Sequence, residues 1–456
     1  MVKKMKVLVI NGSPKGEYSV TLQTVKYLEI LFKGHQFEVL HVGQKIRQYE
    51  KDFSPVIKAV KEADLLLFSY PVYTFAAPSQ LHRFIELLKE SGVSLAGKFV
   101  TQLTTSKHFY DITAHGYIRD NCQEMKMNYI HGLSADMDDL TTKKGQKEAR
   151  DFFAYVEWCI SHHLYETIKP EEKKKPLQPV SLPKKEKRQS EKEVVLITDL
   201  TQQQTQLKDM IQRFCSVMPA KIKIVNLREY PFKGGCIGCF HCAVDGTCIY
   251  QDGFDQYLRT EIQTADAIVY AFSIKDHSMG SLFKLYDDRQ FCNGHRTVTM
   301  GIPVGYLVNG HYSHEVNLQM IIEGRAQVGG NFLAGVACDE INPDQEIDKM
   351  AARLFYGMKK KYVQPSNFYG VGGMKIFRDL IWLMQGMMKA DHQFYKKHGQ
   401  YDFPQKKVGT MLMMYFVGAI ISSPKLKAKM GPTMNEGMLA PYKKVLKRAQ
   451  QTRGKK

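Results

Sequence analysis

The chain has 456 residues, more than one hydrophobic core usually organises, so two domains and an extension are expected. Hydrophobic residues make up 44% and aromatic residues 11% of the sequence, as in ordinary globular proteins, which excludes a disordered chain. No apolar run reaches the roughly 18 residues that a membrane-spanning helix needs, and the longest candidate, 411–421, is expected to form a buried helix.

The net charge of +18 is concentrated towards the C-terminal end. From Ile341 onward there are about 22 Lys and Arg against about 7 Asp and Glu, whereas the preceding three quarters of the chain are close to neutral. Nucleic-acid binding is not expected, because no recognised binding motif accompanies these basic residues.

Short runs of branched apolar residues recur in the two halves of the chain in the same order. They are 6–10, 63–68 and 98–103 in the first half, and 194–197, 265–270 and 297–302 in the second. Helical patterns separate them, which indicates βαβ units and a doubly wound parallel sheet. The sequence therefore predicts an α/β protein made of two copies of one domain in tandem.

The composition places the domain boundaries. We expect the first domain at 1–167 and the second at 194–343. Residues 168–193 are rich in Lys, Glu and Pro with few apolar residues, which predicts a flexible linker. Residues 344–456 are predicted to be a basic, mainly helical C-terminal extension.

The loop after the first strand carries the residue types that bind a phosphate monoester. A following helix N-terminus offers backbone N–H groups and the positive end of its dipole. The loop adds hydroxyls from Ser13, Ser19 and Thr21 and a positive charge from Lys15, and Pro14 between them is counted with the expected binding residues. Strand–turn–helix loops are often rich in Gly, Ser and Pro for structural reasons alone, so this loop does not by itself identify a ligand.

Two later loops strengthen the prediction of a ligand site. Pro71, Val72 and Tyr73 open an aromatic-rich loop suited to the wall of a flat ring, and Thr104, Thr105 and Ser106 offer hydroxyls to its edge. Both loops follow the carboxyl ends of predicted strands, where open α/β sheets bind their ligands.

The Gly-Ser-Pro-Lys loop followed by Ser19, and the Pro-Val-Tyr loop followed by Pro78 and a Leu-x-x-Phe-Ile helix, resemble the NAD(P)H-dependent FMN reductase superfamily over residues 5–160. The resemblance implies a flavodoxin-like fold, with NAD(P)H as reductant. It implies that the first loop holds the FMN phosphate and that the other two flank the ring. One departure is Glu86-Leu87, where relatives usually have Asp-Arg.

The second copy departs from the same pattern in its loops. Its first loop, 198–205, has no glycine or basic residue, and Asp199 would repel a phosphate. It nevertheless keeps the Asp288-Arg289 helix ending that the first copy has lost. We therefore expect one FMN per chain.

Four cysteines lie close together in the second copy: Cys236, Cys239, Cys242 and Cys248. Met1–Met5 leads straight into the first strand without a signal-peptide pattern, so a reducing compartment is expected and a metal outranks disulfides. Four thiolates at this spacing can converge on a cube of iron and sulfide. The run resembles iron–sulfur flavoproteins of the same superfamily, which implies a [4Fe–4S] cluster; zinc and a metal-free structural turn are the other interpretations.

These features predict an FMN-dependent NAD(P)H oxidoreductase that passes electrons, directly or through an iron–sulfur cluster, to a small organic or quinone-like acceptor. The alternative is an electron-transfer or redox-sensing module without a dedicated organic substrate. No side chain is assigned a catalytic role, since the chemistry belongs to the cofactor. Relatives commonly work as homodimers, so the resemblance implies an intramolecular pseudo-dimer, and a homodimer of the whole chain is a further expectation.

The extension allows two interpretations. Its Met-rich helices either pack on the two sheets, which we favour, or lie at the inner face of a membrane with lysines on the lipid headgroups. A cytoplasmic protein, with this peripheral membrane contact as the second interpretation, is expected.

Overall fold

The computed structural model describes residues 4–168, 174–184 and 189–422, together with a few positions between 439 and 451. It divides into two compact units, Met1–Tyr395 and Lys396–Lys456. Two stretches of the predicted linker 168–193, residues 169–173 and 185–188, lie outside the described residues, as does most of the predicted extension beyond residue 422.

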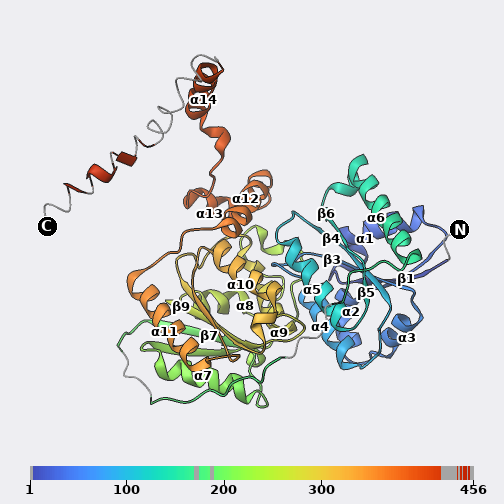
Figure 1. The fold of residues 1–456 in the computed structure, drawn as a ribbon, viewed down its shortest axis with the longest axis horizontal. Coiled ribbons are helices and arrows are strands. Elements are labelled where there is room, and N and C mark those ends of the chain that lie inside the picture. The colour runs from blue at the N-terminus through green and yellow to red at the C-terminus, as the bar shows by residue number, and fades with distance from the viewer. Residues whose placement is uncertain are drawn as a thin grey trace. The chain divides into compact units, whose positions relative to one another are not determined.

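The first domain is built on a parallel sheet in the strand order β2-β1-β3-β4-β5, to which β6 adds beside β4 (Figure 1). Its strands are β1 (Lys6–Asn11), β2 (Gln36–Leu40), β3 (Leu65–Pro71), β4 (Phe99–Ser106), β5 (Asn128–Tyr129) and β6 (Leu133–Asp136). In this order β3 lies between β1 and β4. The loops after these three parallel strands therefore leave the sheet at the same edge, the one formed by the carboxyl ends of the strands.

Helices cover both faces of this sheet because its strands are apolar on both sides. Val7 and Val9 pack into the core under α1 (Val20–Leu31) and α6 (Lys143–Ser161). Their neighbours Leu8 and Ile10 belong to the opposite core. That core is covered by α2 (Val42–Tyr49), α3 (Ser54–Glu62), α4 (Ser79–Glu90) and α5 (Asp111–Glu124).

The second domain repeats this winding in the order β8-β7-β9-β10-β11, with all strands parallel. Its strands are β7 (Glu193–Thr198), β8 (Lys221–Asn226), β9 (Ala267–Ser273), β10 (Pro303–Asn309) and β11 (Phe332–Cys338). One face carries α7 (Thr205–Val217) and α11 (Pro343–Lys360), and the other α8 (Phe254–Tyr257), α9 (Ser281–Arg289) and α10 (Val316–Gly329). The predicted fold class, two doubly wound flavodoxin-like domains with a helical C-terminal region, is confirmed.

Two details of the second domain differ from the sequence prediction. The strand expected at 297–302 is wrong, because these residues form turns with Gly301 at a φ of 82°, and β10 begins only at Pro303. The core also continues past the expected boundary at residue 343, since α11 buries Ile347 and Leu354 against the sheet.

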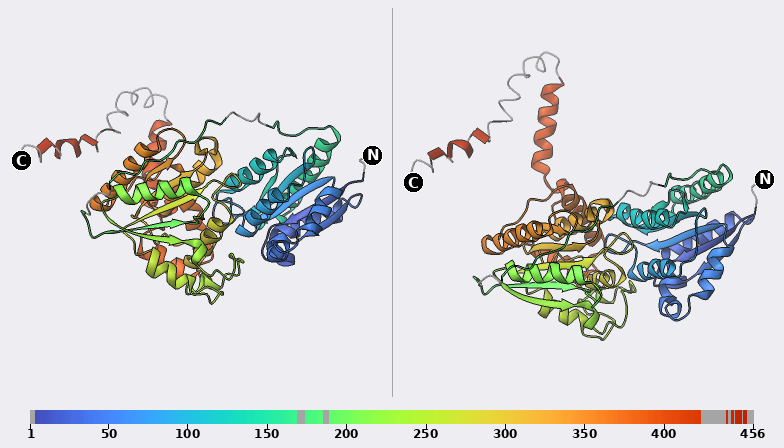
Figure 2. Two further views of the ribbon diagram at one scale, coloured as in Figure 1. Left: turned by 90° about the horizontal axis from the view of Figure 1, so that it is seen from below. Right: turned by 60° about the horizontal axis from the view of Figure 1, so that its bottom comes forward.

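The two domains pack against each other through α4 and α5 of the first and α9 and α10 of the second (Figure 2). The contact is reciprocal. The Ser281 N–H at the start of α9 donates to Glu86 Oε1 at 2.7 Å, and the Ser79 N–H at the start of α4 donates to Asp288 Oδ2 at 2.8 Å. Each carboxylate therefore satisfies the free N–H groups of the other domain's helix.

The remaining helices follow α11. Helix α12 (Phe368–Leu383) packs on α10, and α13 (Lys389–Lys397) buries Asp391 and Tyr395. Helix α14 (Val408–Ile421) is a helix as expected, but its large apolar side chains are exposed rather than buried. None of the helices in the described residues is long and apolar enough to cross a membrane.

Candidate flavin site

The three predicted flavin loops lie together at the carboxyl edge of the first sheet. Strand pairing aligns Asn11 with Ser69 and Pro71 with Thr105, so the loops leave the sheet at the same level. The Val72 N–H donates to the Thr105 carbonyl at 3.3 Å. The hydroxyls of Thr21 and Thr105 are hydrogen-bonded at 2.6 Å, which joins the first loop to the third.

The first loop is shaped by Asn11, which the sequence prediction did not single out. Its amide Nδ2 donates to the Gly16 carbonyl at 3.0 Å, and its Oδ1 accepts from the Ser13 N–H at 3.2 Å. These bonds fold the chain into a turn directly ahead of α1, whose first residues carry N–H groups without helical partners.

The two buried serines of this loop fit a phosphate. Ser13 Oγ accepts from the Lys15 N–H and Ser19 Oγ accepts from the Leu22 N–H, each at 3.3 Å. Each hydroxyl keeps its proton for donation, and Ser19 is the N-cap of α1, where the helix dipole favours an anion. With the ammonium of Lys15, this donor set suits the dianionic end of FMN.

The second loop turns sharply after Tyr73. Thr74 and Phe75 both have positive φ, at 42° and 71°, and the Tyr73 N–H donates to the Ala76 carbonyl at 2.8 Å. The Tyr73 carbonyl in turn accepts from Lys284 Nζ of the second domain at 2.7 Å. Burial raises the pKa of the Tyr73 phenol well above its ordinary value, so it remains a neutral hydrogen-bonding group.

The third loop presents its hydroxyls from the end of β4. Thr104 Oγ1 is 2.8 Å from His115 Nε2, and Ser106 Oγ accepts from the His108 N–H at 2.9 Å. Burial lowers the pKa of His115 to about 4, so the imidazole is neutral at pH 7. The three loops therefore offer neutral polar groups to a ring edge and one cation to a phosphate.

The second domain supplies a cover for this edge in the form of the cysteine-bearing segment 233–248, here called the cysteine loop. Gln80 Nε2 donates to the Cys236 carbonyl at 3.2 Å. Gly238 approaches the Tyr73 hydroxyl so closely that a Cβ there would lie 2.0 Å from it. Lys15 Nζ lies 5.2 Å from the centre of the Phe240 ring. The cysteine loop thus touches the first loop, the second loop and the start of α4.

The four cysteine thiols of this loop are not arranged as a metal site. Among the described residues, no group of three or more His, Cys, Asp or Glu side chains could hold a metal ion. Cys236 Sγ accepts from the Gly238 N–H at 3.4 Å, and Cys242 Sγ donates to the Phe291 carbonyl at 3.1 Å. Burial raises the pKa of Cys236 to about 12 and of Cys242 to about 11, and the neighbouring thiols of the loop add to both shifts.

The structure therefore gives no support to the predicted [4Fe–4S] cluster or to zinc at Cys236, Cys239, Cys242 and Cys248 in the described part of the chain. It agrees better with the third interpretation, a structural turn. Cys292, which the sequence prediction assigned to the core, is buried and next to this loop: burial raises its pKa to about 12, with further upward contributions from Cys242 and Cys248.

Arg289 anchors the cysteine loop from inside the second domain. Its guanidinium binds both carboxylate oxygens of Asp252 at 2.7 and 2.8 Å and donates to the Gly234 carbonyl at 2.9 Å. The rings of Phe232, Tyr250 and Phe254 lie within 6 Å of the guanidinium. Arg289, 2% exposed, therefore makes these hydrogen bonds within its own domain, while its Nε has no hydrogen-bond partner among the described residues.

The corresponding edge of the second sheet carries a different set of side chains. Asp199, 1% exposed, is paired with Lys275 Nζ at 3.2 Å. Gln204 Nε2 donates to Ser273 Oγ at 2.9 Å, and Ser273 donates to Asn309 Oδ1 at 2.7 Å. A buried carboxylate thus lies in the loop equivalent to the phosphate loop of the first domain.

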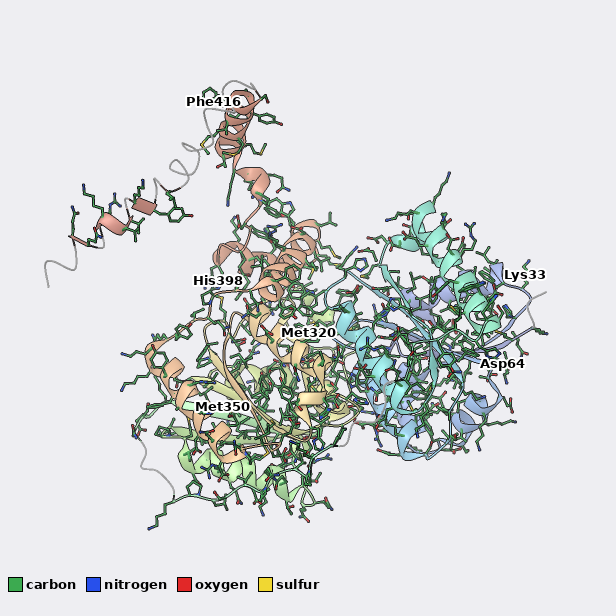
Figure 3. The ribbon with its side chains drawn as sticks, in the orientation of Figure 1. Lys33, Asp64, Met320, Met350, His398 and Phe416 are labelled. Atoms are coloured by element: carbon green, nitrogen blue, oxygen red, sulfur yellow. The ribbon has the colours of Figure 1, made fainter. Side chains whose placement is uncertain are left out.

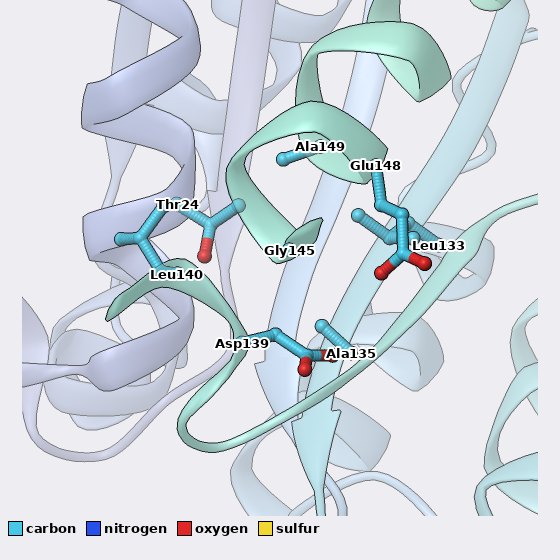
Figure 4. Close-up of a pocket in the computed structure, with 8 residues that line it drawn as sticks. All are labelled: Thr24, Leu133, Ala135, Asp139, Leu140, Gly145, Glu148 and Ala149. Carbon is cyan, nitrogen blue, oxygen red and sulfur yellow. The ribbon is translucent and has the colours of Figure 1, made fainter. Parts of the chain in front are cut away.

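Two hollows elsewhere in the molecule do not involve the three loops. One, of ≈10 Å³, has room for about one water and is lined by Thr24, Leu133, Ala135, Asp139, Leu140, Gly145, Glu148 and Ala149 (Figure 4). The other, of ≈310 Å³, lies in the second domain and is lined by Tyr312, Gln319, Ile322, Glu323, Ala326, Gln327, Leu333 and Gln364.

Comparison with known proteins agrees with this geometry. Residues 5–138 match the model of the family described as NADPH-dependent FMN reductase. The match lies within the first domain, covers less than a third of the chain, and agrees with a flavin-dependent oxidoreductase. No curated protein matches the chain.

Several solved structures resemble part of the chain. An NADH:FMN oxidoreductase in its apo form is 18% identical and covers 34% of this chain and 89% of its own, with a TM-score of 0.30. General stress protein 14 of Treponema denticola, solved with FMN, is 13% identical over 34% of this chain and 98% of its own, with a TM-score of 0.29. The NAD(P)H:(acceptor) oxidoreductase FerB of Paracoccus denitrificans is 16% identical and covers 35% of this chain and 98% of its own, with a TM-score of 0.30.

Proposed function

We propose that the protein is an FMN-dependent NAD(P)H oxidoreductase that passes electrons to a small organic, quinone-like acceptor. The observation that carries the proposal is the meeting of Ser13, Lys15 and Ser19 at the N-terminus of α1, beside the second and third loops. FMN, when bound, accepts a hydride from the nicotinamide and returns electrons to the acceptor.

The side chains would act by binding and orienting. Ser13 and Ser19 would donate to the phosphate, and Lys15 would balance its charge. The second loop, Pro71–Tyr73, would line one side of the ring, and Thr104–Ser106 would bond its edge. The cysteine loop, held on this edge by Gln80 and Tyr73, would keep water from the ring on the second-domain side.

We further propose that each chain binds one FMN and that its two domains take the place of two subunits. Asp199 supports the first point, because its loop holds a buried carboxylate that engages Lys275, whereas the first loop has hydroxyls and the cation of Lys15. The reciprocal capping of α4 and α9 by Glu86 and Asp288 supports the second, since a pseudo-twofold pair requires equivalent contacts in both directions.

In this proposal electrons pass directly from the flavin to the acceptor. The test is anaerobic reduction of the FMN-loaded protein with NADH and with NADPH, followed by addition of a water-soluble quinone. Bleaching of the flavin absorbance and its recovery are expected. A flavoprotein that takes no hydride from either nicotinamide, yet is reduced by a one-electron donor, would instead support the electron-transfer alternative.

A further inference from the structure

Helix α12 has one packed face and one exposed face, which carries large apolar residues together with Lys375 and Asp379. On the packed face Gly370 and Gly373 lie against α10, and Phe377 stacks on Phe109 of the third loop with ring centres 4.1 Å apart. The opposite face exposes Phe368 (84%), Val371 (45%), Trp382 (40%) and Leu383 (80%). Large apolar residues gathered on one exposed helix face indicate a contact with another apolar phase or molecule.

Helix α14 is apolar on all sides and contains no charged residue. Its exposed large side chains are Val408, Met411, Leu412, Met413, Met414, Tyr415 and Phe416 (Figure 3). Helices of this composition are normally buried in a core or in lipid. At about 1.5 Å per residue its length is about 21 Å, short of the roughly 30 Å hydrocarbon layer, so it suits insertion into one leaflet.

The chain around α14 is strongly basic. From Phe403 to the end of the sequence there are twelve Lys and Arg and one acidic residue, Glu436. Lys406 and Lys407 directly precede the helix. Stable attachment to a bilayer takes two signals, an inserted apolar group and a basic segment near anionic headgroups, and this region has both. Other partners explain only one of these two features. A nucleic acid would explain the basic residues but not the apolar helix, and a second copy of the chain would explain the apolar helix but not the basic residues.

We propose that the exposed face of α12 and, independently, helix α14 of the C-terminal unit with its flanking lysines each bind the surface of a membrane that contains anionic lipids. Because α12 also packs on Phe109 of the third loop, this contact brings the lipid surface next to the flavin site. The electron acceptor would then be a molecule dissolved in the lipid. This inference about the substrate class rests on the proposed function.

The test is sedimentation of the full chain with vesicles of phosphatidylglycerol and phosphatidylcholine, and with vesicles of phosphatidylcholine alone. The bound fraction at low salt is expected to be about tenfold higher on the anionic vesicles and to fall in about 0.5 M salt. Two double variants are expected to weaken binding about tenfold each: Leu412→Glu/Phe416→Glu in α14 and Phe368→Ser/Leu383→Ser in α12. The matched control Ile341→Glu changes another exposed apolar residue and should bind as the wild type does.

Three results would overturn the proposal. The first is that the wild type fails to sediment with anionic vesicles, and the second is that the α14 variant binds these vesicles as well as the wild type does. The third is that the wild type binds no vesicles but self-associates without lipid, and the α14 variant abolishes this self-association. Flavin absorbance and NAD(P)H oxidation with a water-soluble acceptor are measured on the same preparations without vesicles. Their loss would count against the proposed function, whereas intact turnover without vesicle binding would count against the membrane contact alone.

Discussion

Replacing His277 by Asn is expected to remove a pH-dependent contribution to the packing of the two domains. His277 Nδ1 lies 2.9 Å from Glu315 Oε2 of the second domain, and its Nε2 lies 3.2 Å from Glu124 Oε2 of the first. Burial would lower the pKa of His277, but hydrogen bonds and charge from Glu124 and Glu315 outweigh it and raise the pKa from 6.5 to about 9. The imidazole is therefore a cation that bridges the domains at neutral pH.

The magnitude follows from this shift. The rise of the His277 pKa from 6.5 to about 9 corresponds to at most about 3.4 kcal/mol, and solvent at the half-exposed Glu124 reduces this to about 1–2 kcal/mol. A folded-state pKa above the unfolded one stabilises the fold fully below about pH 6.5, and the contribution is lost as the pH rises through about 9. The hydrogen bond from His277 also lowers the pKa of Glu124 to about 2, so that carboxylate stays charged throughout this window.

Urea unfolding of the wild type and of His277→Asn at about pH 6 and about pH 9.5 measures the effect. Asn tolerates the left-handed backbone at this position, where φ is 58°, so the strain of the substitution is small and does not vary with pH. The difference in unfolding free energy between the two proteins should shrink by about 1–2 kcal/mol between the two pH values. His131→Asn, at an imidazole that is 78% exposed, is the control. Parallel pH profiles for the wild type and His277→Asn would refute the reasoning.

Three further outcomes are expected. Ser13→Ala should weaken FMN binding about tenfold through loss of one donor to the phosphate, measured by flavin fluorescence, whereas Ser54→Ala, at an exposed helix start, should not. Protein prepared without oxygen should contain less than one iron per chain, and four irons would contradict the thiol arrangement described above. Asp288→Asn should cost about 1–3 kcal/mol of unfolding free energy, because it removes the nearer of the two carboxylates that pair with the buried Lys284 ammonium and leaves only Asp287, 3.6 Å away; an unchanged urea midpoint would contradict this.

The sequence was sufficient to predict most strands of the two sheets, because a short run of branched apolar residues is typical of a buried parallel strand. Residues 6–10 and 194–197 lie within β1 and β7 almost as predicted. The prediction at 297–302 failed because a run of Thr, Val and Met has strand composition but is held in turns, and Pro303 begins the true strand. A short run does not reveal which of its ends pairs with a neighbouring strand.

The contacts between the two domains could not be predicted from the sequence, for a different reason. His82 Nδ1 and the Tyr117 hydroxyl both bind Asp276 Oδ2, at 3.0 and 2.6 Å, yet Asp276 lies more than 150 residues further along the chain. A buried histidine and a loop aspartate have no local pattern that pairs them. The same holds for the cover of the flavin edge, where Gln80 and Gly238 meet only after both domains have folded.

The equivalent positions at the ends of α4 and α9 show how the two copies have come to differ. Glu86 and Asp288 both keep a carboxylate, because each caps the other domain's helix and the loss of either would leave buried N–H groups unpaired. The next residues are not equivalent: Leu87 is buried, whereas Arg289 binds Asp252 and the Gly234 carbonyl. Since Gly234 begins the stretch that covers the flavin loops, arginine is needed only in the second copy. The Glu86-Leu87 departure therefore removes an anchor from the half that has no such loop, while the second half keeps the arginine that holds the cysteine loop in place.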